Sequence, residues 1–277
     1  MDLKIINEKI KEFEYLVQSG RCEKFQGELF TGVDLGTSSI VLSVIDEKGH
    51  FVAGASRKAR SIRDGIVVDY LGAVKIVTEL KEDLERCLGK TLRYGSAAIP
   101  PGVGEGSSKI LSNILEATEF QVVSIIDEPE AAALLLGIKD GAVVDIGGGT
   151  TGISVLENGE IVLSYDEATG GHHMNLVIAG ALKLDVEEAE KKKIKEPNKV
   201  FPIISPVAEK MAKIVHHAID SLQVETVYLV GGSTDFPKMN QLFKKELNKK
   251  IIKPYKPIYV TPMGIALSCR NEVMKIE

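Results

Sequence analysis

Apolar residues along the chain follow two different spacings, which predict helices in some segments and strands in others. Within residues 1–20, Ile6, Ile10, Phe13 and Val17 recur at the spacing of one helix face. An isolated helix of this length is marginal in water, so its apolar side needs a surface to cover. We expect that surface to be either the rest of this chain or a partner protein that binds the helix in a groove.

Two matched segments divide the remaining chain into related halves. DLGTSSIVLSVIDEKG, residues 34–49, aligns with DIGGGTTGISVLENG, residues 145–159. Asp34 then matches Asp145, and Gly36 matches Gly147. Another apolar run follows each copy, so each half is predicted to begin with three strands joined by turns. Two related α/β halves that face one another predict a ligand-binding cleft between them.

Helical and apolar segments alternate after each copy. In the first half, helices are predicted over 71–89, 107–120 and 128–137, and strands over 94–100 and 121–127. We expect Ser107 or Ser108 to cap the second of these helices. In the second half, helices are predicted over 170–184, 185–195, 205–222, 235–249 and 262–273, and strands over 226–232 and 256–260.

Composition and charge narrow the class of protein. Hydrophobic residues make up 44% of the chain, charged residues make up 26%, and the formal net charge is −5. This balance favours a well-packed protein and argues against a nucleic-acid or anionic-membrane surface. No apolar run reaches the length of a transmembrane segment. Cys22, Cys87 and Cys269 are isolated in the sequence, which predicts reduced thiols in a cytoplasmic protein.

The glycine-rich turns at the two matched positions predict phosphate binding. A single turn of this kind also joins ordinary hairpin strands, so one copy alone is weak evidence. Two turns that converge on one cleft offer backbone N–H groups to phosphate oxygens. Asp34 and Asp145 precede these turns, and two carboxylates beside phosphate need a cation between them. Mg²⁺ suits this role, because carboxylates can hold it through its bound water.

Five motifs in order resemble those of the actin and heat-shock chaperone ATPase superfamily. They are GVDLGTSS, IIDEPEAAALLLG, DIGGGTT, VYLVGGSTDFPKMNQL and TPMGIALSC, which span nearly the whole chain. The resemblance implies an actin-like ATPase fold, with two related ribonuclease-H-like domains that flank a nucleotide cleft. It implies boundaries at 1–28 for the first helix and its linker, 29–140 for the first domain and 141–261 for the second. The last helix, 262–277, would pack back on the first domain.

The resemblance also implies roles for residues within the matched motifs. Asp34 and Asp145 would hold Mg²⁺ through water, and Glu128 would orient the attacking water with help from Asp145 and Thr150. The implied nucleotide contacts are Gly36, Thr37 and Ser38 in the first loop, Gly147, Gly148, Gly149 and Thr150 in the second, and Gly231, Gly232 and Ser233 beneath the adenosine. Glu187 and Lys191 would contact the ribose or adenine. An exposed helical ion pair explains that last pair equally well.

Some positions depart from the superfamily pattern. Gly152 stands where the chaperones carry an acidic residue, which weakens one metal contact, and Asp235 replaces the arginine that stacks on adenine. His172 and His173 follow the TGG sequence in place of acidic residues. They fit surface polarity or a hinge better than a metal site, which would need more ligands. No counterpart of the chaperones' catalytic lysine is evident, so hydrolysis of ATP is expected to be slow or to need a partner.

Three functions remain open on this basis. The first is an ATP-dependent, chaperone-like switch. The second is an assembly protein that self-associates or acts as an adaptor, because RDGIVVDY, residues 63–70, resembles segments of bacterial actins and of the pilus protein PilM. The third, which we rank last, is a small-molecule kinase. In its short insertions and extra first helix, the chain resembles a branch of this superfamily that is associated with ethanolamine utilisation. The resemblance implies microcompartment shell proteins or enzymes of that pathway as clients.

Overall fold

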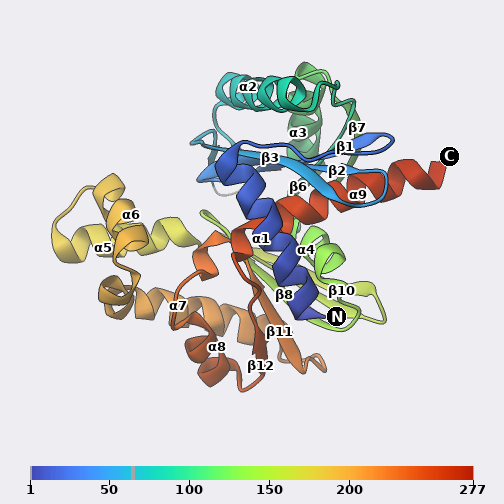
Figure 1. Cartoon of the computed structure of the whole chain (residues 1–277). Helices are drawn as coiled ribbons and strands as arrows, with labels where there is room; N and C mark the ends of the chain where they lie inside the picture. The colour runs from blue at the N-terminus through green and yellow to red at the C-terminus, as the bar shows by residue number, and fades with distance from the viewer. Residues whose placement is uncertain (1, 64–65, 277) are drawn as a thin grey trace.

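Two five-stranded sheets with the same topology form the two halves of the molecule (Figure 1). The computed structural model describes residues 2–63 and 66–276, so Asp64 and Gly65 of RDGIVVDY lie outside the described residues. The first sheet has the order β3 (Phe51–Lys58), β2 (Ser39–Asp46), β1 (Leu29–Leu35), β6 (Tyr94–Ile99) and β7 (Gln121–Asp127). The second has the order β10 (Glu160–Glu167), β9 (Thr151–Glu157), β8 (Gly141–Ile146), β11 (Thr226–Val230) and β12 (Lys250–Ile252).

Each sheet begins with an antiparallel meander and continues with parallel strands. β1 pairs antiparallel with β2 and parallel with β6, and β8 pairs in the same ways with β9 and β11. The predicted α/β fold with two related halves is therefore confirmed. Because β1 and β8 are the middle strands and begin the two sequence repeats, the turns that follow them occupy equivalent places in the two halves.

Helices cover the outer faces of the sheets and separate the two halves (Figure 1). α2 (Tyr70–Leu88) and α3 (Glu105–Ala117) pack on the first sheet, beside a short hairpin of β4 (Ile62–Arg63) and β5 (Ile66–Val67). α4 (Glu128–Leu136) and α9 (Val260–Ile276) pack against each other between the halves. The second half carries α5 (Gly171–Leu182), α6 (Val186–Lys195), α7 (Pro197–Ile219) and α8 (Met239–Leu247). None of the helices in residues 2–63 and 66–276 is long and apolar enough to cross a membrane.

Three local predictions are wrong. Residues 256–260 are not a strand, because Pro257–Tyr259 form a 3₁₀ turn (η2) that leads into α9, and the edge strand is β12. The helix predicted from Ser107 starts at Glu105, and no side chain caps it. The helix predicted from residue 205 starts at Pro197, since Pro suits the first turn of a helix.

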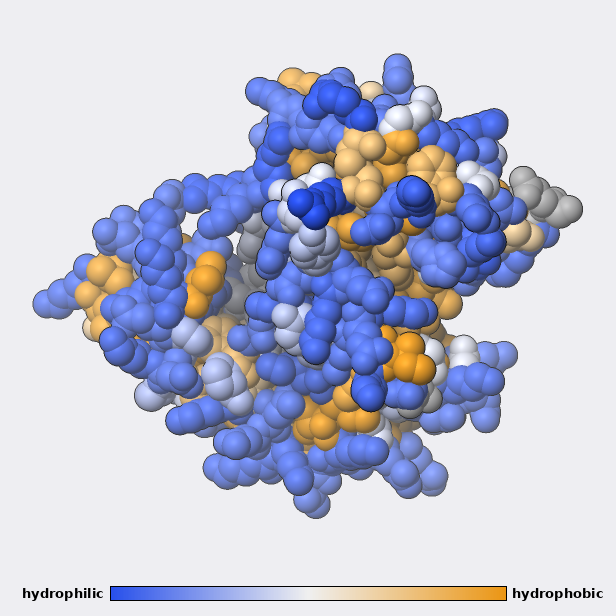
Figure 2. All heavy atoms as spheres, viewed as in Figure 1, coloured by the Kyte–Doolittle hydropathy of each residue, from blue (hydrophilic) through white to orange (hydrophobic). Residues whose placement is uncertain are grey.

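The first helix, α1 (Leu3–Ser19), packs on its own chain, so the intramolecular alternative is confirmed. Ile10 and Phe13 are fully buried. The Phe13 ring makes edge contacts with Phe51 of the first half, at 5.6 Å, and with Tyr259 of η2, at 5.5 Å. The outward face of α1 is mostly hydrophilic (Figure 2). The helix thus crosses from the first half to the second, in front of both in the view of Figure 1, and contacts each of them.

A disulfide joins Cys22, in the linker after α1, to Cys87 near the end of α2, with the two Cα atoms 6.1 Å apart. The prediction that all three cysteines are reduced is therefore wrong for this pair. Cys269 is free and buried in α9. Because the two cysteines are 65 residues apart, their proximity depends on the tertiary fold and leaves no local pattern in the sequence.

Candidate functional site

A cavity of about 260 Å³ lies between the two halves, at the ends of β1 and β8. Its walls include nearly every site residue predicted from the sequence. These are Asp34, Gly36, Thr37, Ser38, Glu128, Asp145, Gly147, Gly148, Gly149, Thr150, Gly231, Gly232 and Ser233. The structure thus brings together residues that are up to 199 positions apart (233 − 34 = 199).

The two glycine-rich turns have the same local geometry and face each other across the cavity. The Gly36 N–H donates to the Ser39 carbonyl at 3.1 Å, and the Gly147 N–H donates to the Thr150 carbonyl at 3.0 Å. A Cβ atom at Gly148 would lie 2.7 Å from Ser38 Oγ and 3.0 Å from Thr37 Cβ, so glycine lets the two turns pack closely without any shift of these side chains. The second turn is also held by Ser233, whose hydroxyl donates to the Gly147 carbonyl at 2.7 Å.

Three carboxyl groups in the cavity have raised pKa values. Burial and the nearby Asp145 raise the pKa of Asp34 to about 7. Burial raises the pKa of Asp145 to about 6, although the Thr261 hydroxyl, which donates to it at 2.5 Å, acts in the opposite direction. The pKa of Glu128 lies well above its usual value because of burial and the charges of Asp145 and Asp34. Buried carboxylates that repel one another form a site where a cation is stabilised.

The donor set suits a cation that keeps its water. In residues 2–63 and 66–276, no group of three His, Cys, Asp or Glu side chains is arranged to ligate a metal directly. Mg²⁺ retains several waters in proteins and is often held through them. The residues present therefore fit the water-mediated role predicted for Asp34 and Asp145.

α6 contributes a different pair from the one expected. Glu190, Lys193 and Ile194 line the cavity, whereas Glu187 and Lys191 do not. Glu187 lies on the surface, and Lys191 is exposed. The side of α6 that carries Ala189 faces the protein interior, because Ala189 is the one fully buried residue of this helix in the described part of the chain.

Lys193 is the cation of the cavity wall among the described residues. Its Nζ donates to the Gly171 carbonyl at 3.0 Å. Burial lowers the pKa of Lys193 to about 8, although Glu190 acts in the opposite direction. Local sequence does not distinguish this lysine from its neighbours Lys191 and Lys192, because the lysine that faces the cavity is set by how α6 packs on α5 and α7.

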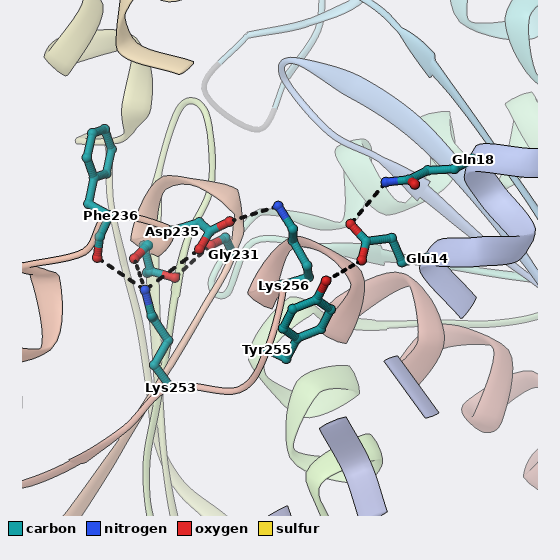
Figure 3. Close-up of polar contacts among 9 residues, drawn as sticks. Glu14, Gln18, Gly231, Asp235, Phe236, Lys253, Tyr255 and Lys256 are labelled. Atoms are coloured by element: carbon teal, nitrogen blue, oxygen red, sulfur yellow. Dashed lines mark hydrogen bonds and ion pairs between the residues drawn. The ribbon is translucent and has the colours of Figure 1, made fainter. Parts of the chain in front are cut away.

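Asp235 and the two histidines have structural contacts outside the cavity wall. Asp235 points toward Lys253, at 3.8 Å, and Lys256, at 3.5 Å (Figure 3). His173 Nδ1 accepts a hydrogen bond from the Gly170 N–H at 3.2 Å and so caps the start of α5. The sequence interpretation offered surface polarity or a hinge for this residue, and the structure gives it a helix-capping contact instead.

Comparisons with known proteins define the class of the chain. The family model described as MreB/Mbl protein matches residues 52–195, and that of the type IV pilus assembly protein PilM matches residues 137–268. MreB5 of Spiroplasma citri bound to AMPPNP superposes with a TM-score of 0.75 at 16% identity, over 91% of this chain and 98% of that one. The chain therefore has the fold of the actin-like ATPases.

Closer relatives identify the family. The ethanolamine utilization protein EutJ of Escherichia coli is 39% identical over 89% of this chain and 88% of its own length. The crystal structure of EutJ from Carboxydothermus hydrogenoformans superposes with a TM-score of 0.91 at 41% identity, over 96% of this chain and 99% of that one. The chain belongs to the EutJ family, which confirms the predicted branch of the superfamily.

Proposed function

We propose that this protein is a conformational switch that binds ATP or ADP with Mg²⁺ between its halves and hydrolyses ATP slowly. The single observation that carries the proposal is the pair of glycine-rich turns, one from each half, that face each other beside buried carboxyls. Nucleotide bound there would contact both halves at once, so its loss would favour a different angle between them. The solved MreB5 structures bound to AMPPNP and to ADP support this use of the fold.

The predicted residue roles become proposals for this cavity. The turns after β1 and β8 would surround the phosphates, and Gly231, Gly232 and Ser233 would lie beneath the nucleoside. We assign the contact with the ribose or adenine to Glu190 and Lys193 in place of Glu187 and Lys191, because only the former pair lines the cavity. Asp34 and Asp145 would hold the cation through water, and bound Mg²⁺ would offset phosphate charge.

Slow hydrolysis follows from the groups that line the cavity. Glu128 stands beside Asp34 and Asp145 at the start of α4, where it can orient a water and accept its proton. Thr150, at the end of the second turn, is buried in the same wall. Lys193 comes from α6, and its Nζ donates a hydrogen bond to the Gly171 carbonyl; its charge is not among those that shift the pKa values of these acids. Phosphoryl transfer depends mainly on positioning and charge stabilisation, so the lack of a lysine there limits the rate.

The names of the EutJ relatives support a role in ethanolamine utilisation. We propose chaperone-like action in the cytoplasm on microcompartment shell proteins or pathway enzymes. We also keep, as a proposal, the domain boundaries predicted from the sequence. The match to DnaK of Thermus thermophilus, 27% identical over 69% of this chain but only 42% of DnaK, supports the chaperone-like part. An assembly adaptor is the second candidate, because the PilM–PilN complex superposes with a TM-score of 0.72 at 15% identity. A kinase ranks last.

Thermal unfolding with and without nucleotide tests the proposal. ATP or ADP with Mg²⁺ should raise Tm, since a ligand at a hundredfold its Kd adds ~2.7 kcal/mol to the free energy of unfolding.

Variants of the cavity acids test their separate roles. Asp34→Asn and Asp145→Asn should weaken nucleotide binding in Mg²⁺ more than in EDTA. Glu128→Gln should bind ATP but lose hydrolysis, on the order of 10²- to 10⁴-fold. An unchanged Tm at millimolar nucleotide, on protein freed of bound ligand, contradicts the proposal. Sedimentation with ATP separates an assembling protein from a monomeric switch.

A further inference from the structure

Three adjacent strands carry Asp145, Gly152 and Asp166 in one row across the second sheet. Asp145 on β8 is paired with Gly152 on β9, and Gly152 is paired in turn with Asp166 on β10. Residues paired in this way project from the same face of a sheet. Asp166 therefore projects from the same sheet face as Asp145, and the residue between them has no side chain. Asp166 lies behind the cavity wall, next to Thr150, which lines the cavity.

The space above Gly152 is occupied by two prolines. A Cβ atom at Gly152 would lie 3.0 Å from Cδ of Pro101 and 3.3 Å from Cγ of Pro129. A larger side chain at residue 152 would have to displace one of these rings, which are held by the loop before α3 and by the first turn of α4. β9 therefore cannot present a carboxylate here in the present packing, and an acid on this side of the cavity has to come from another strand.

Asp166 is an acid without a compensating positive charge. Its Oδ1 atom is shielded from solvent and has no hydrogen-bond partner among the described residues. The Thr150 side chain faces its carboxyl group, and Asp145 and Glu167 repel it. Asp166 is also one of the charges that act on Glu128, so it belongs electrostatically to the acids of the cavity. A shielded carboxylate among other carboxylates is costly unless a cation or a further donor approaches it.

We propose that Asp166 is a third carboxylate of the cation site, which supplies from β10 the charge that Gly152 does not supply from β9. The inference rests on the proposed function, because it assumes that Mg²⁺ enters with the nucleotide. Asp166 acts through the water of the cation, since the described acids do not form a directly ligating group. It is therefore a positioning residue for the cation and its water.

Asp166→Asn tests this role, because it removes the charge and keeps the shape of the side chain. With Mg²⁺, binding of AMPPNP should weaken by roughly 10- to 100-fold, as for other residues that support a metal through its outer shell. In EDTA, the same variant should bind AMPPNP as well as the parent or more tightly, because one negative charge near the phosphates is gone. Titration calorimetry in the two buffers measures both effects.

Glu167→Gln is the matched control. Glu167 is the next residue on β10, so its side chain projects from the opposite face, where it accepts a hydrogen bond from the Tyr165 hydroxyl at 2.8 Å. Because Glu167 also repels Asp166, its removal should not weaken binding in Mg²⁺, and it should leave binding in EDTA close to that of the parent. Equal weakening of Asp166→Asn in Mg²⁺ and in EDTA, or no weakening in either, would overturn the role of Asp166. Failure of the parent protein to bind AMPPNP in either buffer would instead overturn the proposed function itself.

Discussion

Arg60 of the first half and Glu187 of the second half form an ion pair across the cavity mouth, with 2.8 Å between Nη2 and Oε1. Arg60 lies two residues before Ile62, and Glu187 lies one helical turn before Glu190; both of these neighbours line the cavity. The pair is well exposed, so its contribution to folding is small. Its position beside the mouth means that the two halves cannot separate there without breaking it.

Breaking this ion pair should therefore affect nucleotide release more than stability. Arg60→Ala and Glu187→Ala should each leave Tm unchanged and increase the dissociation rate of a fluorescent nucleotide, by roughly two- to fivefold. The exchanged double variant, Arg60→Glu with Glu187→Arg, should restore slow release. Stopped-flow displacement measures the rate, and high salt should remove the difference between parent and variants. Equal release rates in low salt would show that the pair does not restrain the opening.

Nucleotide binding should take up a proton at Lys193. The pKa of this lysine is about 8 in the structure, so at pH 8 it is half protonated. A polyanion in the cavity favours the charged form and raises this pKa, so Lys193 should take up about half a proton at pH 8 and almost none at pH 6. Mg²⁺ should at the same time release protons from Asp34 and Asp145, whose pKa values are raised, so the share of Lys193 is the difference between the parent and a variant without this lysine. Calorimetry in buffers of different ionisation enthalpy measures the uptake. Lys193→Met should lower the net uptake at pH 8 by about half a proton relative to the parent, whereas Lys192→Met, on the same helix but outside the cavity wall, should leave it unchanged.

The packing of α1 should contribute strongly to stability. Phe13→Ala removes a fully buried ring between Phe51 and Tyr259, and such truncations cost about 3–5 kcal/mol. Ile5→Ala is the control, because Ile5 is on the same helix and is 52% exposed. Its effect should stay within about 0.5 kcal/mol. Urea unfolding measures both variants, and similar losses for the two would mean that the contact of α1 with the body is weak.

The disulfide should add stability that reduction removes. Cys22 and Cys87 close a loop with a sequence separation of 65, for which the chain-entropy relation gives about 4 kcal/mol. Cys22→Ser should lower the free energy of unfolding by up to that amount in oxidising buffer. In dithiothreitol the parent protein should become as unstable as the variant, while the variant should not respond. A parent protein that is insensitive to dithiothreitol at full reduction would contradict this contribution.

The two-part fold and the two turns of the cavity could be predicted because the two halves of the chain carry the same sequence pattern. Asp34 and Asp145 end equivalent strands, and a turn of fixed local geometry follows each, so one alignment places both sides of the cavity. The sequence could not select Glu190 and Lys193 as residues that line the cavity, because the side of α6 that faces the cavity is set by its packing against α5 and α7. The proposed role of Asp166 could not be predicted from the sequence, because it depends on the strand register that places Asp166 opposite Gly152.

Other errors have the same tertiary origin. The apolar run at residues 256–260 has a strand-like composition, but Pro257 starts a 3₁₀ turn there, and Val260 already begins α9. The edge position is filled by Ile251 and Ile252, which pair with β11. Pairing of Cys22 with Cys87 likewise depends on where the linker passes α2. Local spacing cannot encode any of these contacts between distant segments.

Some contacts of α1 and α9 join segments that are synthesised early to segments that are synthesised last. The Tyr255 N–H donates to Asn7 across 248 residues, and the Ser43 hydroxyl donates to the Pro262 carbonyl across 219 residues. At about 5–20 residues per second, a ribosome needs on the order of 10–50 s to make the later partners after the earlier ones. During that time the part of α1 that contacts Tyr259 and the α9-facing side of the first sheet stay uncovered. Phe30 and Ile45 of that sheet remain exposed until Ala266 and Cys269 have been made. The first half of this protein therefore cannot finish folding while it is being synthesised, and its nascent chain presents an apolar surface to the cell until the last helix has been made.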